Sequence, residues 1–102
     1  MSQVTKEELI FTIIAAIPHG KVASYGQIAS LAGYPNHARL VGKLLKHMPS
    51  DSTIPWHRVV NSQGKLSFPQ ASEKYNLQRQ QLLSEGVSFT KERINMSHYG
   101  WQ

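Results

Sequence analysis

The sequence predicts a small α/β domain that is mainly helical, and three observations support this. The chain has 102 residues, which suits a single domain over residues 1–102. Several segments repeat apolar residues at the spacing of an amphipathic helix. Extended character is limited to short pieces, and "HRVV" and "KLS" around the turn "NSQG" predict a small β-hairpin over residues 57–67.

The first helix is predicted to begin at Thr5 and to end at Ile17. Thr5, with Glu8 three residues later, forms a capping box. Pro18 disfavours helical geometry at the residue before it, which places the helix end at Ile17. The apolar face of this helix consists of Leu9, Ile10, Ile13, Ile14 and Ile17.

Two shorter helices are predicted next. Ser24 and Gln27 form a second capping box, and Gly33 stops the helix that they open. After the turn "GYPN", Asn36 is predicted to cap a third helix that reaches about His47. Two helices joined by a short turn with glycine predict a helix-turn-helix unit, although many other helix pairs share this pattern. The residues expected to face the core are Ile28, Leu31 and Ala32, then Leu40, Val41, Leu44 and Leu45.

The C-terminal part is predicted to contain one more helix. Ser72 is expected to cap it, and it should reach about Ser84, with Gly86 as its stop. The following "VSF" and the tail "INMSHYGW" are predicted to be extended or irregular. The aromatic residues expected to pack back on the body are Phe89, Tyr99 and Trp101.

The charge of the chain points to a polyanionic partner. It carries 11 Lys and Arg residues against 6 Asp and Glu, a formal net charge of +5. A basic balance favours nucleic acid, although basic proteins without such a partner also exist. Arg39, Lys43 and Lys46 share the face of the third helix opposite its leucines. Such a stripe is commonly a solvated face. Its place on the second helix of a helix-turn-helix candidate favours a surface that faces DNA.

The residue counts exclude several kinds of site. Without cysteine, the chain has no disulfide, no thiolate nucleophile and no thiolate metal site. Its five histidines are scattered, and no glycine-rich phosphate loop is present, so neither a metal nor a cofactor is predicted. No apolar run approaches transmembrane length and no signal peptide is evident, which predicts a cytoplasmic protein without membrane contact.

The segment "IPWHRVV", residues 54–60, has the composition of an active-site wall. His57 together with an acid such as Glu85 is the type of pair that activates a serine or cysteine nucleophile. The residue beside the histidine is Trp56, whose indole is not a nucleophile. From the residues alone, two interpretations stay open. The pair is either the remnant of a catalytic array or a structural histidine beside a core tryptophan.

Three stretches in order, "IPHGKVASYGQIASLAG", "ARLVGKLLK" and "IPWHRVV", together resemble the C-terminal domain of O6-alkylguanine-DNA alkyltransferases. In that family the last motif reads Pro-Cys-His-Arg, and its cysteine accepts the alkyl group. Trp56 in this position is the mark of the alkyltransferase-like proteins, which the chain resembles from about Thr5 to Phe89. The resemblance implies a winged-helix-like helix-turn-helix DNA-binding domain that acts as a monomer. It also implies a non-enzymatic sensor that flips O6-alkylguanine in double-stranded DNA and hands it to nucleotide excision repair proteins.

The resemblance also implies roles for individual residues toward DNA. Tyr25 is expected to press on the phosphate beside the lesion, and Arg39 to fill the space that the flipped nucleotide leaves. His37 and Ala38 are expected against the minor groove, with a small residue at 38 allowing close approach. The residues expected near phosphates are Ser24, Gly26, Lys46 and Ser62. Lys43 is expected to contact DNA because it belongs to the basic face of the third helix.

The same resemblance implies a pocket for the flipped base. Trp56 is expected to present its ring to the alkyl group, with His57 and Glu85 kept as a hydrogen-bonded framework. Pro69 stands where the transferases have a tyrosine that bonds the base oxygen, and Met48 stands where they have an asparagine. Gln70 is a candidate to replace the tyrosine. The remaining pocket residues are expected to be Leu45, Leu66 and Phe68.

Two functions from other classes compete with a damage sensor. A sequence-specific transcriptional regulator would place the helix-turn-helix in the major groove and show no preference for an alkylated base. A hydrolase would use His57 to activate water and would release the alkyl group as product.

Overall fold

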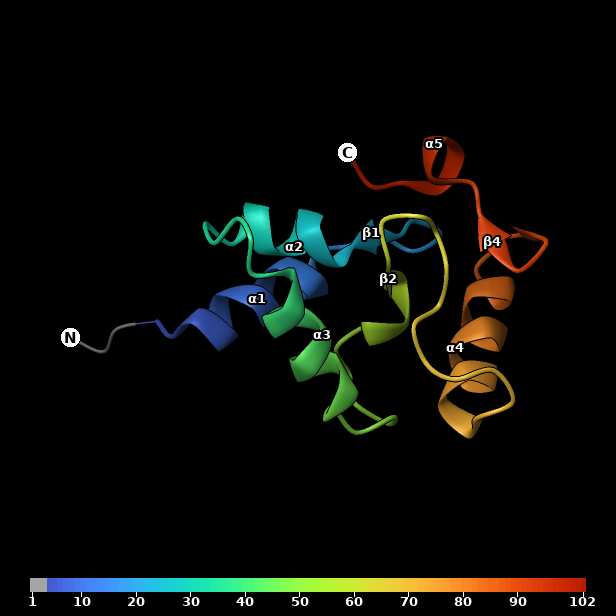
Figure 1. The fold of residues 1–102 in the computed structure, drawn as a ribbon, viewed down its shortest axis with the longest axis horizontal. Helices are drawn as coiled ribbons and strands as arrows, with labels where there is room; N and C mark the ends of the chain where they lie inside the picture. The colour runs from blue at the N-terminus through green and yellow to red at the C-terminus, as the bar shows by residue number, and fades with distance from the viewer. Residues whose placement is uncertain (1–3) are drawn as a thin grey trace.

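The computed structural model describes residues 4–102, and its helices dominate the architecture (Figure 1). The predicted fold class, a mainly helical α/β domain, is confirmed. The helices are α1 (Lys6–Ala15), α2 (Tyr25–Leu31), α3 (Ala38–Lys46), the 3-10 turn η1 (Trp56–Arg58), α4 (Glu73–Ser84) and α5 (Met96–Tyr99). The strands are β1 (Ala23–Ser24), β2 (Val59–Val60), β3 (Phe89–Thr90) and β4 (Arg93–Ile94). Within residues 4–102, none of the helices combines the length and apolar character that crossing a bilayer requires.

Two hydrophobic clusters meet at the parallel pairing of β1 with β2. In Figure 1, α1, α2 and α3 gather on one side and α4 with β4 on the other, while β2 lies between them. Ala23 and its partner Val59 belong to the cluster of α1, α2 and α3. Val22 and Val60, one residue away, belong to the cluster of α4. The segment after Trp56 is therefore held by both halves of the molecule.

At the starts of α1 and α2, the structure contains the hydrogen bond from the N-cap side chain that each predicted capping box requires. The hydroxyl of Thr5 accepts from the Glu8 N–H, and that of Ser24 accepts from the Gln27 N–H, each at 3.1 Å. Helix α1 ends at Ala15, two residues before the predicted end. The chain tightens there into bonds to the third residue back, and Ile17 still reaches the core with 1% exposure.

The start of α3 differs from the prediction. Asn36 does not cap the helix, because it adopts a left-handed conformation with φ 72° in the turn closed by the His37 N–H and the Tyr34 carbonyl. Asparagine tolerates this conformation better than most residues, and the turn uses that property. His37 is the N-cap residue, and its side chain makes no capping bond.

One of the apolar residues expected inside is at the surface. Leu31 lies in the last turn of α2 and is 53% exposed, whereas Ile28 and Ala32 are buried as predicted. Because α2 has only seven residues, it presents little more than one narrow stripe to the core. In α3, Val41 and Leu45 are buried, and Leu40 and Leu44 are half-buried.

The hairpin predicted over residues 57–67 is wrong. Val59 and Val60 pair in parallel with Ala23 and Ser24, and both valines are buried. A two-stranded hairpin would leave one face of this pair open, which two adjacent buried valines do not permit. The stretch after them is a turn, in which the Asn61 carboxamide oxygen accepts from two backbone N–H groups.

A hairpin does form near the C-terminus, in a region predicted to be extended or irregular. Strands β3 and β4 pair antiparallel, and Lys91 and Glu92 between them both have positive φ, 53° and 59°. Two such residues in succession are typical of a tight hairpin turn. The tail then forms the short helix α5, capped by Asn95. It returns to the body where the Trp101 N–H donates to the Val22 carbonyl at 2.8 Å.

Candidate nucleic-acid interface

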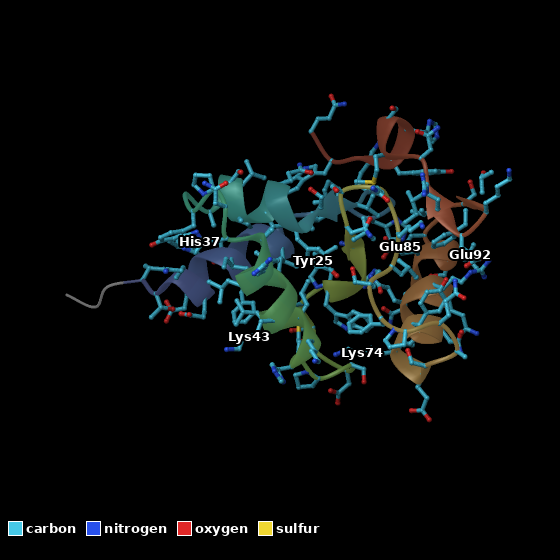
Figure 2. All side chains as sticks on the ribbon, viewed as in Figure 1. Tyr25, His37, Lys43, Lys74, Glu85 and Glu92 are labelled. Carbon is cyan, nitrogen blue, oxygen red and sulfur yellow. The ribbon has the colours of Figure 1, made fainter. Side chains whose placement is uncertain are left out.

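Helix α3 presents three cationic side chains to solvent. Arg39, Lys43 and Lys46 are all exposed, and among the described residues their side chains make no hydrogen bond or ion pair. Figure 2 shows Lys43 and Tyr25 on opposite sides of α3. The three residues keep the single stripe that their spacing predicts, within about 60° around the helix. Lys46 borders the pocket beside Tyr25, and Lys43 borders a different one.

The start of α3 suits close contact with an anionic surface. His37 bonds the Pro35 carbonyl through Nδ1 at 3.2 Å and does not cap the helix. The first N–H groups of α3 thus have no side-chain acceptor, and a helix N-terminus of this kind attracts phosphate. Ala38 is the first helical residue and adds only a methyl group.

Helix α2 positions the three residues predicted at its start. The Ser24 hydroxyl caps α2 by accepting from the Gln27 N–H. It can still donate its hydrogen to a phosphate oxygen and accept one more hydrogen bond. Tyr25 follows as the first helical residue, and burial raises the pKa of its phenol, although Ser67 opposes this in part. Gly26 is exposed, and a Cβ there would meet no atom within 4 Å. A ligand backbone can approach this position closely.

A pocket of about 320 Å³ opens between the start of α2, the middle of α3 and the loop after residue 66. Most of its surface is apolar, and one cation, that of Lys46, stands at its edge. The pocket is lined by Tyr25, Gly42, Lys46, Ser67, Phe68 and Pro69.

Two of the six residues predicted to line a lesion pocket, Phe68 and Pro69, line this one. Leu45 and Leu66 are buried, with 2% and 8% exposure, and do not reach it. Trp56 is 2% exposed and meets Phe68 edge-on, with ring centroids 5.9 Å apart. Its ring packs in the core and does not line this pocket, and the contact of Trp56 with a flipped base stays a prediction.

His57 belongs to a polar network that lies away from this pocket. Its Nε2 is 2.6 Å from Glu85 Oε2, and Arg58 donates to both oxygens of the same carboxylate at 2.8–3.2 Å. Arg58 also donates to the Ile17 carbonyl at 2.7 Å, and the Gly20 N–H donates to Glu85 Oε1 at 2.9 Å. The network ties the loop after α1 to η1 and to the end of α4.

Glu85 is held as an anion by these donors. Burial alone would raise the pKa of its carboxyl, but hydrogen bonds from Arg58, the Gly20 N–H and His57 outweigh burial and lower it from 4.5 to about 2. An ionised carboxylate only accepts, so the His57 Nε2 carries the proton of their hydrogen bond. This pair has the geometry of a base with its orienting acid.

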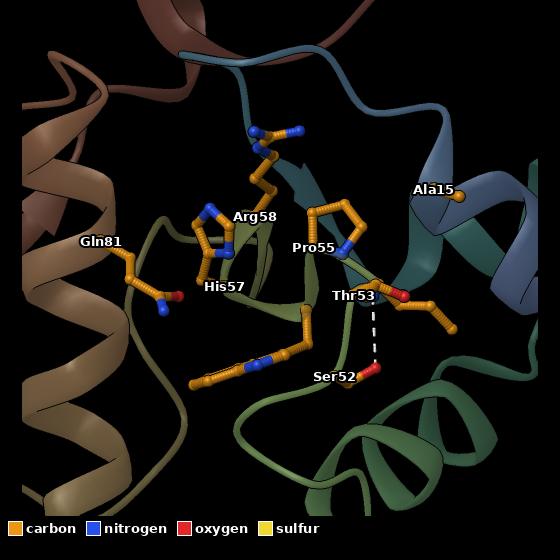
Figure 3. A pocket seen from close by; sticks show the side chains of 9 residues that line it. Ala15, Ser52, Thr53, Pro55, His57, Arg58 and Gln81 are labelled. Atoms are coloured by element: carbon orange, nitrogen blue, oxygen red, sulfur yellow. Dashed lines mark hydrogen bonds between the residues drawn. The ribbon is translucent and has the colours of Figure 1, made fainter.

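A second pocket of about 320 Å³ lies beside His57 (Figure 3). Figure 3 shows Gln81 of α4 on one side of it and Ala15 of α1 on the other. Ser52 lines this pocket, and its hydroxyl accepts from the Ile54 N–H at 3.2 Å. Among the described residues, no hydroxyl bonds His57. Nor do three metal-ligating side chains come together anywhere in the described part. These observations do not favour the competing hydrolase function, in which His57 would activate water.

Sequence reasoning missed Gly42 and Ser67 as pocket residues. A glycine inside an amphipathic helix costs about 1 kcal/mol relative to alanine, and such a position often marks a close approach of another molecule. Gly42 stands between Arg39 and Lys46 on α3, and a Cβ there would meet nothing within 4 Å. That pattern was available in the sequence. No comparable signal pointed to Ser67.

Comparison with known proteins agrees with this geometry. A family model for the DNA-binding domain of 6-O-methylguanine DNA methyltransferase matches residues 6–87. The chain is 46% identical over 94 residues to a DNA base-flipping protein of Vibrio parahaemolyticus, covering 91% of this chain and 92% of that one. It is 37% identical over 98 residues to alkyltransferase-like protein 1 of Schizosaccharomyces pombe, covering 91% of each.

A solved structure gives the same result in three dimensions. The S. pombe alkyltransferase-like protein, in complex with damaged DNA containing O6-carboxymethylguanine, superposes with a TM-score of 0.85 at 34% identity. The match covers 100% of this chain and 99% of that one. The fold is that of the methyltransferase DNA-binding domain. The chain belongs to this family and, within it, to the alkyltransferase-like DNA base-flipping proteins, which do not catalyse alkyl transfer.

Proposed function

We propose that this protein binds O6-alkylguanine in double-stranded DNA, extrudes the damaged nucleotide and leaves the lesion unrepaired. One observation carries the proposal. The pocket lined by Tyr25, Lys46 and Phe68 opens beside the exposed cations of α3, in a chain that contains no cysteine. A nucleotide leaving the duplex at that helix therefore has a partly apolar cavity to enter and no thiolate to react with.

Arg39 is suited to replace the extruded nucleotide. It lies one turn before Gly42 on α3 and is exposed without a partner among the described residues. Flipping costs a few kcal/mol of stacking and pairing, least at a damaged pair. A side chain that enters the stack and bonds the orphaned base offsets part of that cost. Tyr25 lines the same pocket, which supports the role of pressing on the neighbouring phosphate.

The remaining predicted DNA contacts surround these two residues. Ala38 and the uncapped start of α3 favour close docking in the minor groove, with His37 beside them. Ser24 and Gly26 flank Tyr25, and the predicted phosphate contacts at Lys43, Lys46 and Ser62 are exposed. Lys43 faces away from the pocket, so we assign it to the more distant backbone.

The lesion, once bound, requires another protein for its removal, because the chain has no cysteine to accept the alkyl group. We propose nucleotide excision repair proteins as the recipients, with this protein acting as a monomer. DNA binding implies action where the chromosome lies, and we assign the protein to the cytoplasm, associated with the nucleoid in a bacterial cell.

The proposal is tested by binding to one duplex with and without a single O6-methylguanine. We expect tighter binding to the modified duplex at every salt concentration, because the lesion preference is not electrostatic. A duplex with O6-carboxymethylguanine extends the test to the adduct seen with the S. pombe relative. Equal affinities for modified and unmodified duplex, with strong dependence on base sequence, would favour a helix-turn-helix regulator instead.

A further inference from the structure

Lys74 makes contacts that the roles described so far do not require. It lies in the first turn of α4, where a cation opposes the helix dipole. Figure 2 shows it in the space between α4 and α3. Its Nζ donates to the carbonyls of Leu45, Lys46 and Met48 at 3.2, 3.3 and 2.7 Å. Leu45 and Lys46 end α3, and the Leu45 carbonyl also accepts from the Met48 N–H at 3.2 Å. A cation at this C-terminal end is stabilised by the dipole of α3.

The same ammonium group lies over two aromatic rings. Its Nζ is 5.3 Å from the centre of the Trp56 ring and 5.1 Å from that of Phe68. Both distances fall within the range of attractive cation–π contacts. The two rings meet edge-on, so the lysine holds a pair of aromatic residues as well as a helix end. Partial burial lowers the pKa of Lys74 from its ordinary value of 10.5.

These contacts converge on the pocket lined by Tyr25, Lys46 and Phe68, which we call the lesion pocket. Phe68 and Lys46 both line it, and Lys46 is the last residue of α3. Lys74 itself does not line the pocket, but it touches the ring of one lining residue and the carbonyl of the other. We propose that Lys74 is a positioning residue that fixes the Phe68 wall and the end of α3, and thereby sets the preference for alkylated guanine. This inference rests on the proposed function.

The test compares Lys74→Met with the wild-type protein. Methionine keeps an unbranched apolar stem and removes the cation. We expect the ratio of affinities for the O6-methylguanine duplex and the unmodified duplex to fall roughly threefold to tenfold, the range of two weakened cation–π contacts. Affinity for the unmodified duplex should stay nearly constant. Lys74→Arg, which keeps the charge, should restore most of the ratio.

Arg79→Met is the matched control, because Arg79 also lies on α4 and over an aromatic ring. Its Cζ is 5.1 Å from the centre of the Phe89 ring, and neither residue lines the lesion pocket. This variant should lower thermal stability and leave the ratio of affinities unchanged. All variants are compared at a temperature below the start of their melting curves. If Arg79→Met lowers the ratio as much as Lys74→Met does, Lys74 acts only through stability and the inference is wrong.

A measurement on the wild-type protein avoids any folding defect. The ε-methylene protons of Lys74 should show upfield NMR shifts from the two rings. These should change when O6-methylguanine duplex is added and not when unmodified duplex is added. Identical shifts in both complexes, or an unchanged affinity ratio in folded Lys74→Met, overturn the inference alone. A wild-type protein with no preference for the lesion overturns the proposed function together with it.

Discussion

Arg39 and Lys43 carry equal charges on one helix and are expected to act differently. Arg39→Ala should weaken binding to a duplex with O6-methylguanine more than binding to a single strand with the same lesion. A single strand has little stacking to refill, so a residue that fills the vacated space matters less there. We expect a loss of about 1–2 kcal/mol on the duplex, a part of the cost of flipping.

Lys43→Ala is the control for Arg39→Ala, because it removes one exposed charge on the side of α3 away from Tyr25. Its effect should be small and similar on both substrates. Equal losses on duplex and single strand for Arg39→Ala would identify Arg39 as a simple phosphate contact. Fluorescence anisotropy with labelled oligonucleotides measures the affinities of the wild-type protein and both variants for each substrate.

Trp56 is expected to matter first for folding. It is 2% exposed, contacts Phe68, and donates its indole N–H to the Ser50 carbonyl at 3.3 Å. Trp56→Ala should therefore lower the free energy of unfolding by about 3–5 kcal/mol, which is typical of losing a buried aromatic side chain. Chemical denaturation measures this loss. A loss below about 1 kcal/mol would mean that the ring leaves the core readily, as an opening pocket would require.

The elements were predictable where the determinants are local. Thr5, Ser24 and Ser72 each cap a helix as their sequence positions predict, because a cap depends on residues three positions apart. The pairing of β1 with β2 joins residues 36 positions apart in register, and no local pattern around Val59 specifies it. The same limit applies to the site. Ser67 enters the pocket, and Trp56 is withdrawn from it, through packing between distant segments.

Glu85 joins the loop after α1 to η1 and α4, and we predict that its ionisation makes the stability of the fold sensitive to acid. The folded-state pKa of Glu85 is about 2, below the ordinary 4.5. Its ionised form therefore stabilises the fold fully above about pH 4.5, and this contribution is lost as the pH falls toward about 2. Glu85→Gln should cost roughly 3 kcal/mol at neutral pH, since Arg58 loses its partner, and should flatten the decline in acid.

Denaturation at several pH values checks this dependence, with Glu92→Gln as the control. The pKa of Glu92 is also lowered, through hydrogen bonds from Arg79 and Tyr75. Its side chain is 44% exposed against 7% for Glu85, so its removal should cost much less. Parallel pH profiles for the wild-type protein and Glu85→Gln would show that this carboxylate does not control acid stability.

For the molecule as a whole, the pair of a histidine and a carboxylate that would assist alkyl transfer is present, but the cysteine that would accept the alkyl group is not. His57 and Glu85 are hydrogen-bonded at 2.6 Å, the arrangement that orients a general base. The neighbouring position holds Trp56, and the chain has no cysteine at any position. An indole carbon or nitrogen is a poor nucleophile toward an alkyl ether, and in this structure the ring is 2% exposed and packs in the core.

Intact-mass spectrometry tests that conclusion on the unaltered protein. After prolonged incubation with excess duplex containing O6-methylguanine, the protein should keep its mass and the DNA should keep its methyl group, while binding persists. Both the protein and the DNA must be analysed, because transfer to the protein and hydrolysis to methanol would each remove the methyl group from the DNA. A protein heavier by one methyl group would reveal an acceptor other than cysteine. Demethylated DNA with unmodified protein would instead show hydrolysis, and His57 in the second pocket, oriented by the Glu85 carboxylate, would be the candidate base.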